Sequence, residues 1–102
     1  MVKYLINQGD ILKVENISKP VLVVSKNFFN ETGEVIACPI YDGGNEGALH
    51  IPISGKKVQG VVHCEKMNLF DMSVRGFSKT DTVGYEDIIN ISDAIQGIFD
   101  YV

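Results

Sequence analysis

Residues 60–66 contain the side chains best suited to chemistry, a histidine and a glutamate two positions apart. Val61 and Val62 are β-branched and follow a glycine, which predicts a β-strand. Because side chains alternate along a strand, His63 and Glu65 are expected on one face, beside each other. An imidazole and a carboxylate are the minimum parts for general acid–base catalysis. The same pair also occurs as an ordinary hydrogen-bonded feature of a strand edge, and the spacing alone does not separate these interpretations.

The sequence indicates no metal centre. A structural zinc site needs four ligands, and Cys38, His50, His63 and Cys64 lack the close paired spacings that mark one. The two cysteines lie in apolar runs, so we expect buried free thiols rather than a disulfide. His50 is expected to be a surface residue of an edge strand. We therefore expect neither a metal nor a cofactor.

Length and composition favour a single globular domain over residues 1–102. The formal net charge of −4 counts against tight, sequence-blind DNA binding, although a local cationic groove remains compatible with it. No apolar run approaches the roughly 18 residues of a membrane span. The first ten residues also lack the pattern of a signal peptide. These features predict a cytoplasmic protein with no membrane association.

The elements that must position His63 and Glu65 are short strands. Strand-like composition occurs at 11–15, 21–24, 35–40, 48–53 and from 60 onward, and the run at 21–24 is apolar enough for burial on both faces. Residues 25–33 predict a loop with a helical turn, its Phe28 and Phe29 directed inward. Asp71 is expected to cap another helical turn over 71–75. Residues 78–82 are polar, and Val83 and Gly84 are expected to end the β-rich part.

Residues 86–102 change to helical periodicity, with apolar residues three or four positions apart. This stripe is expected to pack on the sheet or on a second subunit, and it consists of Ile88, Ile91, Ile95, Ile98 and Val102. Short strands followed by one helix predict a mainly β protein with a C-terminal helix. The strands are expected to form a small, closed or partly closed antiparallel barrel.

Several stretches, taken in order, resemble the MazF/PemK (Kid) toxins. They are GDIL at 9–12, KPVLVVS at 19–25, NETG at 30–33, CPI at 38–40, GVVHCE at 60–65 and DMSVRG at 71–76. The resemblance implies an SH3-like (CcdB/PemK-type) barrel that forms a homodimer. It also implies an mRNA interferase, an endoribonuclease toxin that cuts single-stranded mRNA without a metal through attack of the 2′-hydroxyl. A partner antitoxin usually neutralises such a toxin.

The resemblance also suggests roles for individual residues. Lys19 stands where the family usually has arginine, and His63 and Glu65 stand where the PemK branch has arginine and aspartate. We expect Glu65 to act as base, His63 as acid and Lys19 as phosphate clamp. The expected substrate-binding residues are Tyr41, Asp42, Asn45 and Ser25. A long Gly-x-Glu-Gln-x-Gly loop of the family is reduced here to residues 16–18, which affects substrate preference.

Two other functions stay open at this level. One is a catalytically inactive SH3-like barrel that binds RNA or a protein partner, since altered catalytic positions and a shortened loop suit such a relative. The other is a gyrase-binding toxin resembling CcdB. Those toxins use a tryptophan in their C-terminal tail, and this chain contains no tryptophan. The ribonuclease is the preferred interpretation.

Overall fold

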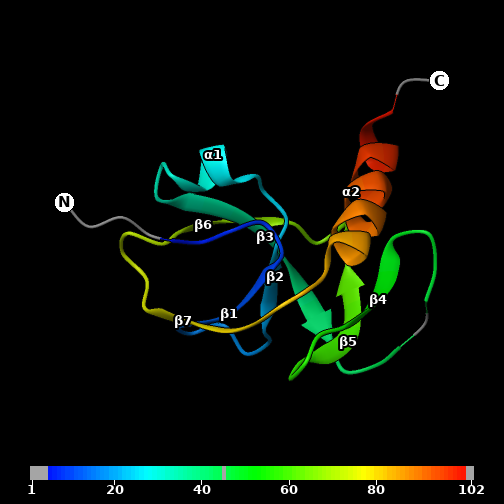
Figure 1. The fold of residues 1–102 in the computed structure, drawn as a ribbon, viewed down its shortest axis with the longest axis horizontal. Helices are drawn as coiled ribbons and strands as arrows, with labels where there is room; N and C mark the ends of the chain where they lie inside the picture. The colour runs from blue at the N-terminus through cyan, green and yellow to red at the C-terminus, as the bar shows by residue number, and fades with distance from the viewer. Residues whose placement is uncertain (1–4, 45, 101–102) are drawn as a thin grey trace.

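The computed structural model describes residues 5–44 and 46–100, which form a curled antiparallel sheet and a C-terminal helix (Figure 1). The helices are α1 (Asn27–Asn30), a single turn, and α2 (Tyr85–Phe99). The sheet has the order β4-β5-β3-β2-β1-β7, and β6 pairs with β3 outside this path. The mainly β fold with a C-terminal helix is therefore confirmed, and the sheet is a half-barrel. The strands are β1 (Asp10–Val14), β2 (Val21–Val23), β3 (Glu34–Tyr41), β4 (His50–Ser54), β5 (Gln59–His63), β6 (Asn68–Asp71) and β7 (Phe77–Thr82).

The curvature of the sheet depends on β3, which changes partner along its length. Residues up to Ala37 pair with β6, whereas Ile40 and Tyr41 pair with β5. The N–H of Ile40 donates to the Pro20 carbonyl on the β2 side, at 2.9 Å. Successive N–H groups of a strand point to opposite sides, so an N–H at position 39 would point away from β2. The partner strand β6 has already ended there, so the missing N–H of Pro39 costs no hydrogen bond of the β3–β6 ladder. Pro39 thus occupies the irregular position that the sequence predicted.

Each face of the central strands has its own apolar core. Because β1, β2 and β3 send alternate side chains to opposite faces, their sequences read as continuous apolar runs, and every residue of β2 is buried. One core contains Leu12, Val14, Val21, Val23, Val35, Ala37, Phe70 and Met72. The other contains Ile11, Leu22, Cys38, Ile40, Val62, Cys64 and Ile91, and both cysteines are buried free thiols as expected.

The helix α2 covers the second of these cores with its first three turns. Ile91 is buried, and Ile88 and Ile95 pack against the same core. The helix ends at Phe99, which is 71% exposed, and Val102 of the expected stripe lies outside the described residues. No helix within the described ranges is both long enough and apolar enough to cross a membrane.

The two ends of the sheet are connected by a side chain. The carboxylate of Asp81, on β7, accepts hydrogen bonds from the N–H groups of Lys57 at 2.7 Å and Val58 at 2.9 Å, in the turn between β4 and β5. These bonds lower the pKa of Asp81 below its ordinary value of 3.8. The half-barrel is therefore held together at its open side without a continuous strand ladder.

The prediction for Phe28 is wrong, since this side chain is 73% exposed. The single turn of α1 instead buries Asn30, whose amide donates to the carbonyl oxygens of Ile6 and Ser25, each at 3.1 Å. Phe29 is partly buried. One helical turn presents only one side to the core, and here the hydrogen-bonding residue takes that place.

The sequence assigned residues 78–82 to no element, and the expectation for Asp71 differs from the structure. Residues 78–82 belong to β7, which pairs with β1 at the edge of the sheet. An edge strand whose faces are partly exposed needs no alternating apolar residues, so the composition of residues 78–82 did not indicate a strand. Asp71 does cap a turn, accepting a hydrogen bond from the Ser73 N–H at 3.0 Å, but it is the last residue of β6 and does not begin a helix.

Candidate functional site

Three rings from neighbouring strands form a stack at one end of the sheet. Tyr41 ends β3, His50 begins β4 and His63 ends β5. His50 and His63 are directly opposite in the β4–β5 ladder, and their ring centroids are 3.9 Å apart with planes 13° apart. Tyr41 lies opposite Val61, one step along the same face from His63, and its ring stacks on His63 with centroids 3.9 Å apart. The imidazole of His63 is thus held between the other two rings.

Glu65 pairs with His50, not with His63 as the strand alternation predicted. The distance between Glu65 Oε2 and His50 Nε2 is 2.9 Å, and the two side chains are 37% and 31% exposed. The strand ends at His63, and a turn closed by the Lys66 N–H to the His63 carbonyl follows. Because this turn interrupts the alternation, Glu65 is carried toward the start of β4. His50, expected to be an ordinary surface residue, is a central member of the site.

The carboxylate of Glu65 is the acceptor in this pair. The hydrogen bond with His50 lowers the pKa of Glu65 below its ordinary value of 4.5, and a backbone hydrogen bond acts in the same direction. Glu65 is therefore ionised at neutral pH. A carboxylate that accepts a hydrogen bond from one imidazole nitrogen fixes the orientation and tautomer of that ring.

His63 is covered by its neighbours. Both of its ring nitrogens are buried, and neither has a hydrogen-bond partner within residues 5–44 and 46–100. Burial lowers the pKa of His63 below its ordinary value of 6.5, and the nearby His50, Lys66 and Lys19 act in the same direction. Since the charged imidazolium is disfavoured, His63 is neutral at neutral pH.

Two ammonium groups lie against the ring of Tyr41, at one end of the stack. Lys19 Nζ, from the short connection between β1 and β2, is 4.5 Å from the centre of the Tyr41 ring. Lys66 Nζ is 4.9 Å from the same centre and donates a hydrogen bond to Tyr41 Oη at 3.0 Å. This hydrogen bond raises the pKa of Lys66 above its ordinary value of 10.5. An acidic chain thus has a local cluster of positive charge beside the imidazole–carboxylate pair.

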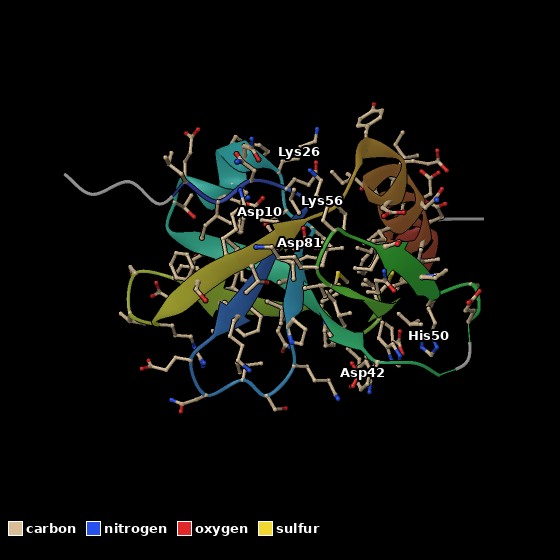
Figure 2. All side chains as sticks on the ribbon, turned by 60° about the horizontal axis from the view of Figure 1, so that its bottom comes forward. Asp10, Lys26, Asp42, His50, Lys56 and Asp81 are labelled. Carbon is tan, nitrogen blue, oxygen red and sulfur yellow. The ribbon has the colours of Figure 1, made fainter. Side chains whose placement is uncertain are left out.

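The remaining candidates are distributed differently. Asp42 follows Tyr41 and is exposed, at the same end of the molecule as His50 in Figure 2. Ser25 belongs to another network, in which it bonds to Asn30 Oδ1 and to the N–H of Ile36. Within the described residues, the side-chain hydrogen bonds of Ser25 go to Asn30 and Ile36 and not to the ring stack. Asn45 lies outside the described residues.

A hollow of about 270 Å³ lies on the same face of β3 as the ring stack. Pro39, which precedes Tyr41 by two positions and so shares its face, forms part of the lining. Asn68, Leu69 and Arg75 line the hollow farther along β3 and β6. The hollow therefore has a cationic side chain, Arg75, at its wall.

Residues 7–99 match the family described as "PemK-like, MazF-like toxin of type II toxin-antitoxin system". The chain belongs to this family. No match was found among the curated proteins. The suspected membership, drawn above from short ordered motifs, is confirmed.

Solved structures of MazF proteins share the fold of this family member. A MazF in a MazE–MazF complex from Deinococcus radiodurans superposes with a TM-score of 0.83 at 19% identity, covering 94% of this chain and 97% of that chain. An endoribonuclease from a mycobacterial species gives a TM-score of 0.84 at 17% identity, covering 97% and 95%. A mycobacterial endoribonuclease in complex with its cognate antitoxin gives a TM-score of 0.79 at 17% identity, covering 92% of this chain and 94% of that chain.

Sequence reasoning missed His50 and Lys66, although a signal for His50 was present. The turn at 54–57 joins two strand-like runs, and a hairpin centred there places His50 opposite His63. Lys66 offered no comparable signal, since its contact with Tyr41 depends on the path of the turn after β5.

Proposed function

We propose that this MazF/PemK family member is an endoribonuclease toxin that cuts single-stranded RNA without a metal. The observation that carries the proposal is the exposed His50–Glu65 hydrogen bond beside the ammonium groups of Lys19 and Lys66. Proton transfer and charge stabilisation at a phosphate are what RNA cleavage by its own 2′-hydroxyl requires. Membership of the MazF-like toxin family supports the same activity.

In the proposed reaction, Glu65 takes the proton of the 2′-hydroxyl as that oxygen attacks the adjacent phosphorus. A bond forms between the 2′-oxygen and phosphorus, and the bond from phosphorus to the 5′-oxygen breaks. His50, in its protonated form, gives a proton to the departing 5′-oxygen. The products are a 2′,3′-cyclic phosphate and a 5′-hydroxyl. His50 Nε2 keeps its proton in the 2.9 Å hydrogen bond to Glu65, so solvent removes the proton from Glu65 and returns one to the other ring nitrogen of His50, which restores the pair.

The other residues bind and position. Lys19 and Lys66 neutralise the phosphate, where developing negative charge is stabilised best by fixed positive groups. Tyr41 offers a ring on which a nucleobase stacks. His63, expected from the sequence to be the acid, has covered ring nitrogens and is assigned here as a positioning residue that holds His50 and Tyr41 in place. Asp42 and the hollow along β6 are proposed to contact neighbouring nucleotides.

The proposed partners are an antitoxin and a second copy of the chain. A relative of known structure is described in complex with its cognate antitoxin, which supports the first. The exposed apolar side chains of Ile98 and Phe99 at the end of α2 support the second, because they are left uncovered by the sheet. A cytoplasmic location, where mRNA is found, accords with both proposals.

The test is cleavage of a labelled single-stranded RNA by the purified chain in the presence of EDTA. We expect fragments with cyclic-phosphate ends, and loss of these fragments with His50→Gln and Glu65→Gln. Glu86→Gln, which removes an exposed carboxylate from the first turn of α2, is the matched control and should cleave normally. Retention of the RNA by the chain without any cleavage would instead favour the inactive RNA-binding barrel.

A further inference from the structure

The fold brings together both histidines of the chain and one carboxylate. One ligand atom from each of His50, His63 and Glu65 lies within 4.8 Å of the other two. The nearest pair, His50 Nε2 and Glu65 Oε2, is 2.9 Å apart. The β4–β5 pairing makes His50 and His63 neighbours, and the turn that follows β5 brings Glu65 to them.

We propose that His50, His63 and Glu65 together bind Zn²⁺, and that the bound ion inhibits the ribonuclease. The inhibitory part rests on the proposed function, whereas the binding of the ion does not. Two imidazoles and a carboxylate are a ligand set that zinc takes in sites with an open fourth position.

The distances require only local adjustment. Zinc bonds to nitrogen and oxygen at about 2.0–2.2 Å, which separates the ligand atoms of a tetrahedral site by roughly 3.3 Å. The His50–Glu65 pair is already near this separation, and an ion would take the place of the proton between the two atoms. The imidazole of His63 has to rotate out of the stack toward them, and its neighbours are partly exposed side chains.

The ring nitrogens of His63 give an independent reason to expect a ligand. Both are buried and without a hydrogen-bond partner among the described residues, and buried polar atoms in proteins are usually satisfied. A metal ion supplies the missing partner for one of them. The thiols of Cys38 and Cys64 do not compete, because both are fully buried in the core beneath the sheet.

The charges near the site set a limit on affinity. Lys19 and Lys66 lie against Tyr41, the ring that stacks on His63, and their positive charges oppose a divalent cation. The two lysines therefore weaken the binding of Zn²⁺ and strengthen the binding of a phosphate at the same site. An ion held by His50 and Glu65 also removes the proposed acid and base, so binding of the ion and cleavage exclude each other.

The binding test uses the full chain, free of RNA, titrated with Zn²⁺ by calorimetry. We expect one ion per chain, and a loss of affinity of at least about tenfold for each of His50→Gln, His63→Gln and Glu65→Gln. The control Glu86→Gln should bind as the unmodified chain does. Lys66→Met should bind Zn²⁺ more tightly, because it removes an opposing charge without removing a ligand.

A second readout is independent of heats of binding. Co²⁺ titrated into the chain should give the visible absorption bands of an ion with nitrogen and oxygen ligands in a low-symmetry site. Zn²⁺ should also raise the thermal unfolding temperature of the unmodified chain, and it should raise that of Glu65→Gln by less at the same Zn²⁺ concentration. Binding that all three ligand substitutions leave unchanged, or no binding, would overturn the site.

The inhibition is tested separately. Saturating Zn²⁺ should stop RNA cleavage, and EDTA should restore it. Cleavage that continues at saturating Zn²⁺ would overturn the inhibitory role while leaving the binding site in place. If Zn²⁺ binds as expected and the chain never cleaves RNA, the proposed function fails and the metal site stands.

Discussion

Replacing the two histidines separately tests which imidazole takes part in the chemistry. His50→Gln removes a partly exposed imidazole that is hydrogen-bonded to Glu65, whereas His63→Phe keeps a flat ring between Tyr41 and His50. Loss of a general acid typically lowers the rate by about 10²–10⁴-fold, which is roughly 3–5 kcal/mol in the barrier. We therefore expect a fall of this size in kcat for His50→Gln. For His63→Phe we expect a change of less than about tenfold, because its ring nitrogens have no hydrogen bond to lose among the residues that the structure describes.

The pair should also behave as a unit. The double variant His50→Gln, Glu65→Gln should be about as slow as either single variant, since residues that act together are not additive. The pH profile gives a further check. The His50 hydrogen bond is the main cause that lowers the pKa of Glu65, so the acid side of the profile, below pH 4.5 in the unmodified chain, should move to higher pH in His50→Gln.

The assay is the initial rate of single-turnover cleavage of a fluorescent single-stranded RNA in EDTA, from pH 4 to pH 9. Circular dichroism and thermal unfolding establish that each variant is folded. His63→Phe removes buried nitrogens that lack a partner within residues 5–44 and 46–100, so it should leave stability unchanged or raise it by about 1–3 kcal/mol. A large loss of rate in His63→Phe together with normal cleavage by His50→Gln would refute the reasoning and return the acid role to His63.

Three other predictions concern pH, salt and packing. Folding lowers the pKa of His63, so the unfolded chain binds the proton first as the pH falls, and stability should decrease below pH 6.5. Thermal unfolding measured at pH 7.5 and at pH 5.5 should show a smaller decrease for His63→Phe than for the unmodified chain. Lys19→Met should weaken RNA binding and reduce the slope of log K against log salt by about 0.7, measured by fluorescence anisotropy; an unchanged slope would place Lys19 off the phosphate path. Ile91→Ala, in the buried face of α2, should lower the free energy of unfolding by about 2–5 kcal/mol in urea titrations, whereas exposed Phe99→Ser should change it by no more than about 0.5 kcal/mol in the monomer.

The fold was largely predictable because burial leaves a local pattern. The apolar run at 21–24 and the helical stripe beginning at Ile88 are each explained by neighbours a few residues away, and both formed the expected element. Residues 78–82 gave no such pattern, because β7 lies at the edge of the sheet and its side chains are mostly exposed. Phe28 was misplaced for a related reason, since a single helical turn has too few residues to show which side is buried.

The sequence by itself determined the family, the strand and helix types, and the presence of histidine, glutamate and lysine at positions that can meet. Only the tertiary structure decided the pairing. Spacing along one strand tells which face a side chain takes, whereas the contacts of His50 and Glu65 depend on the β4–β5 register and on a turn that ends the alternation after His63. Register and turn path are set by the packing of the whole sheet, which no single stretch of sequence contains.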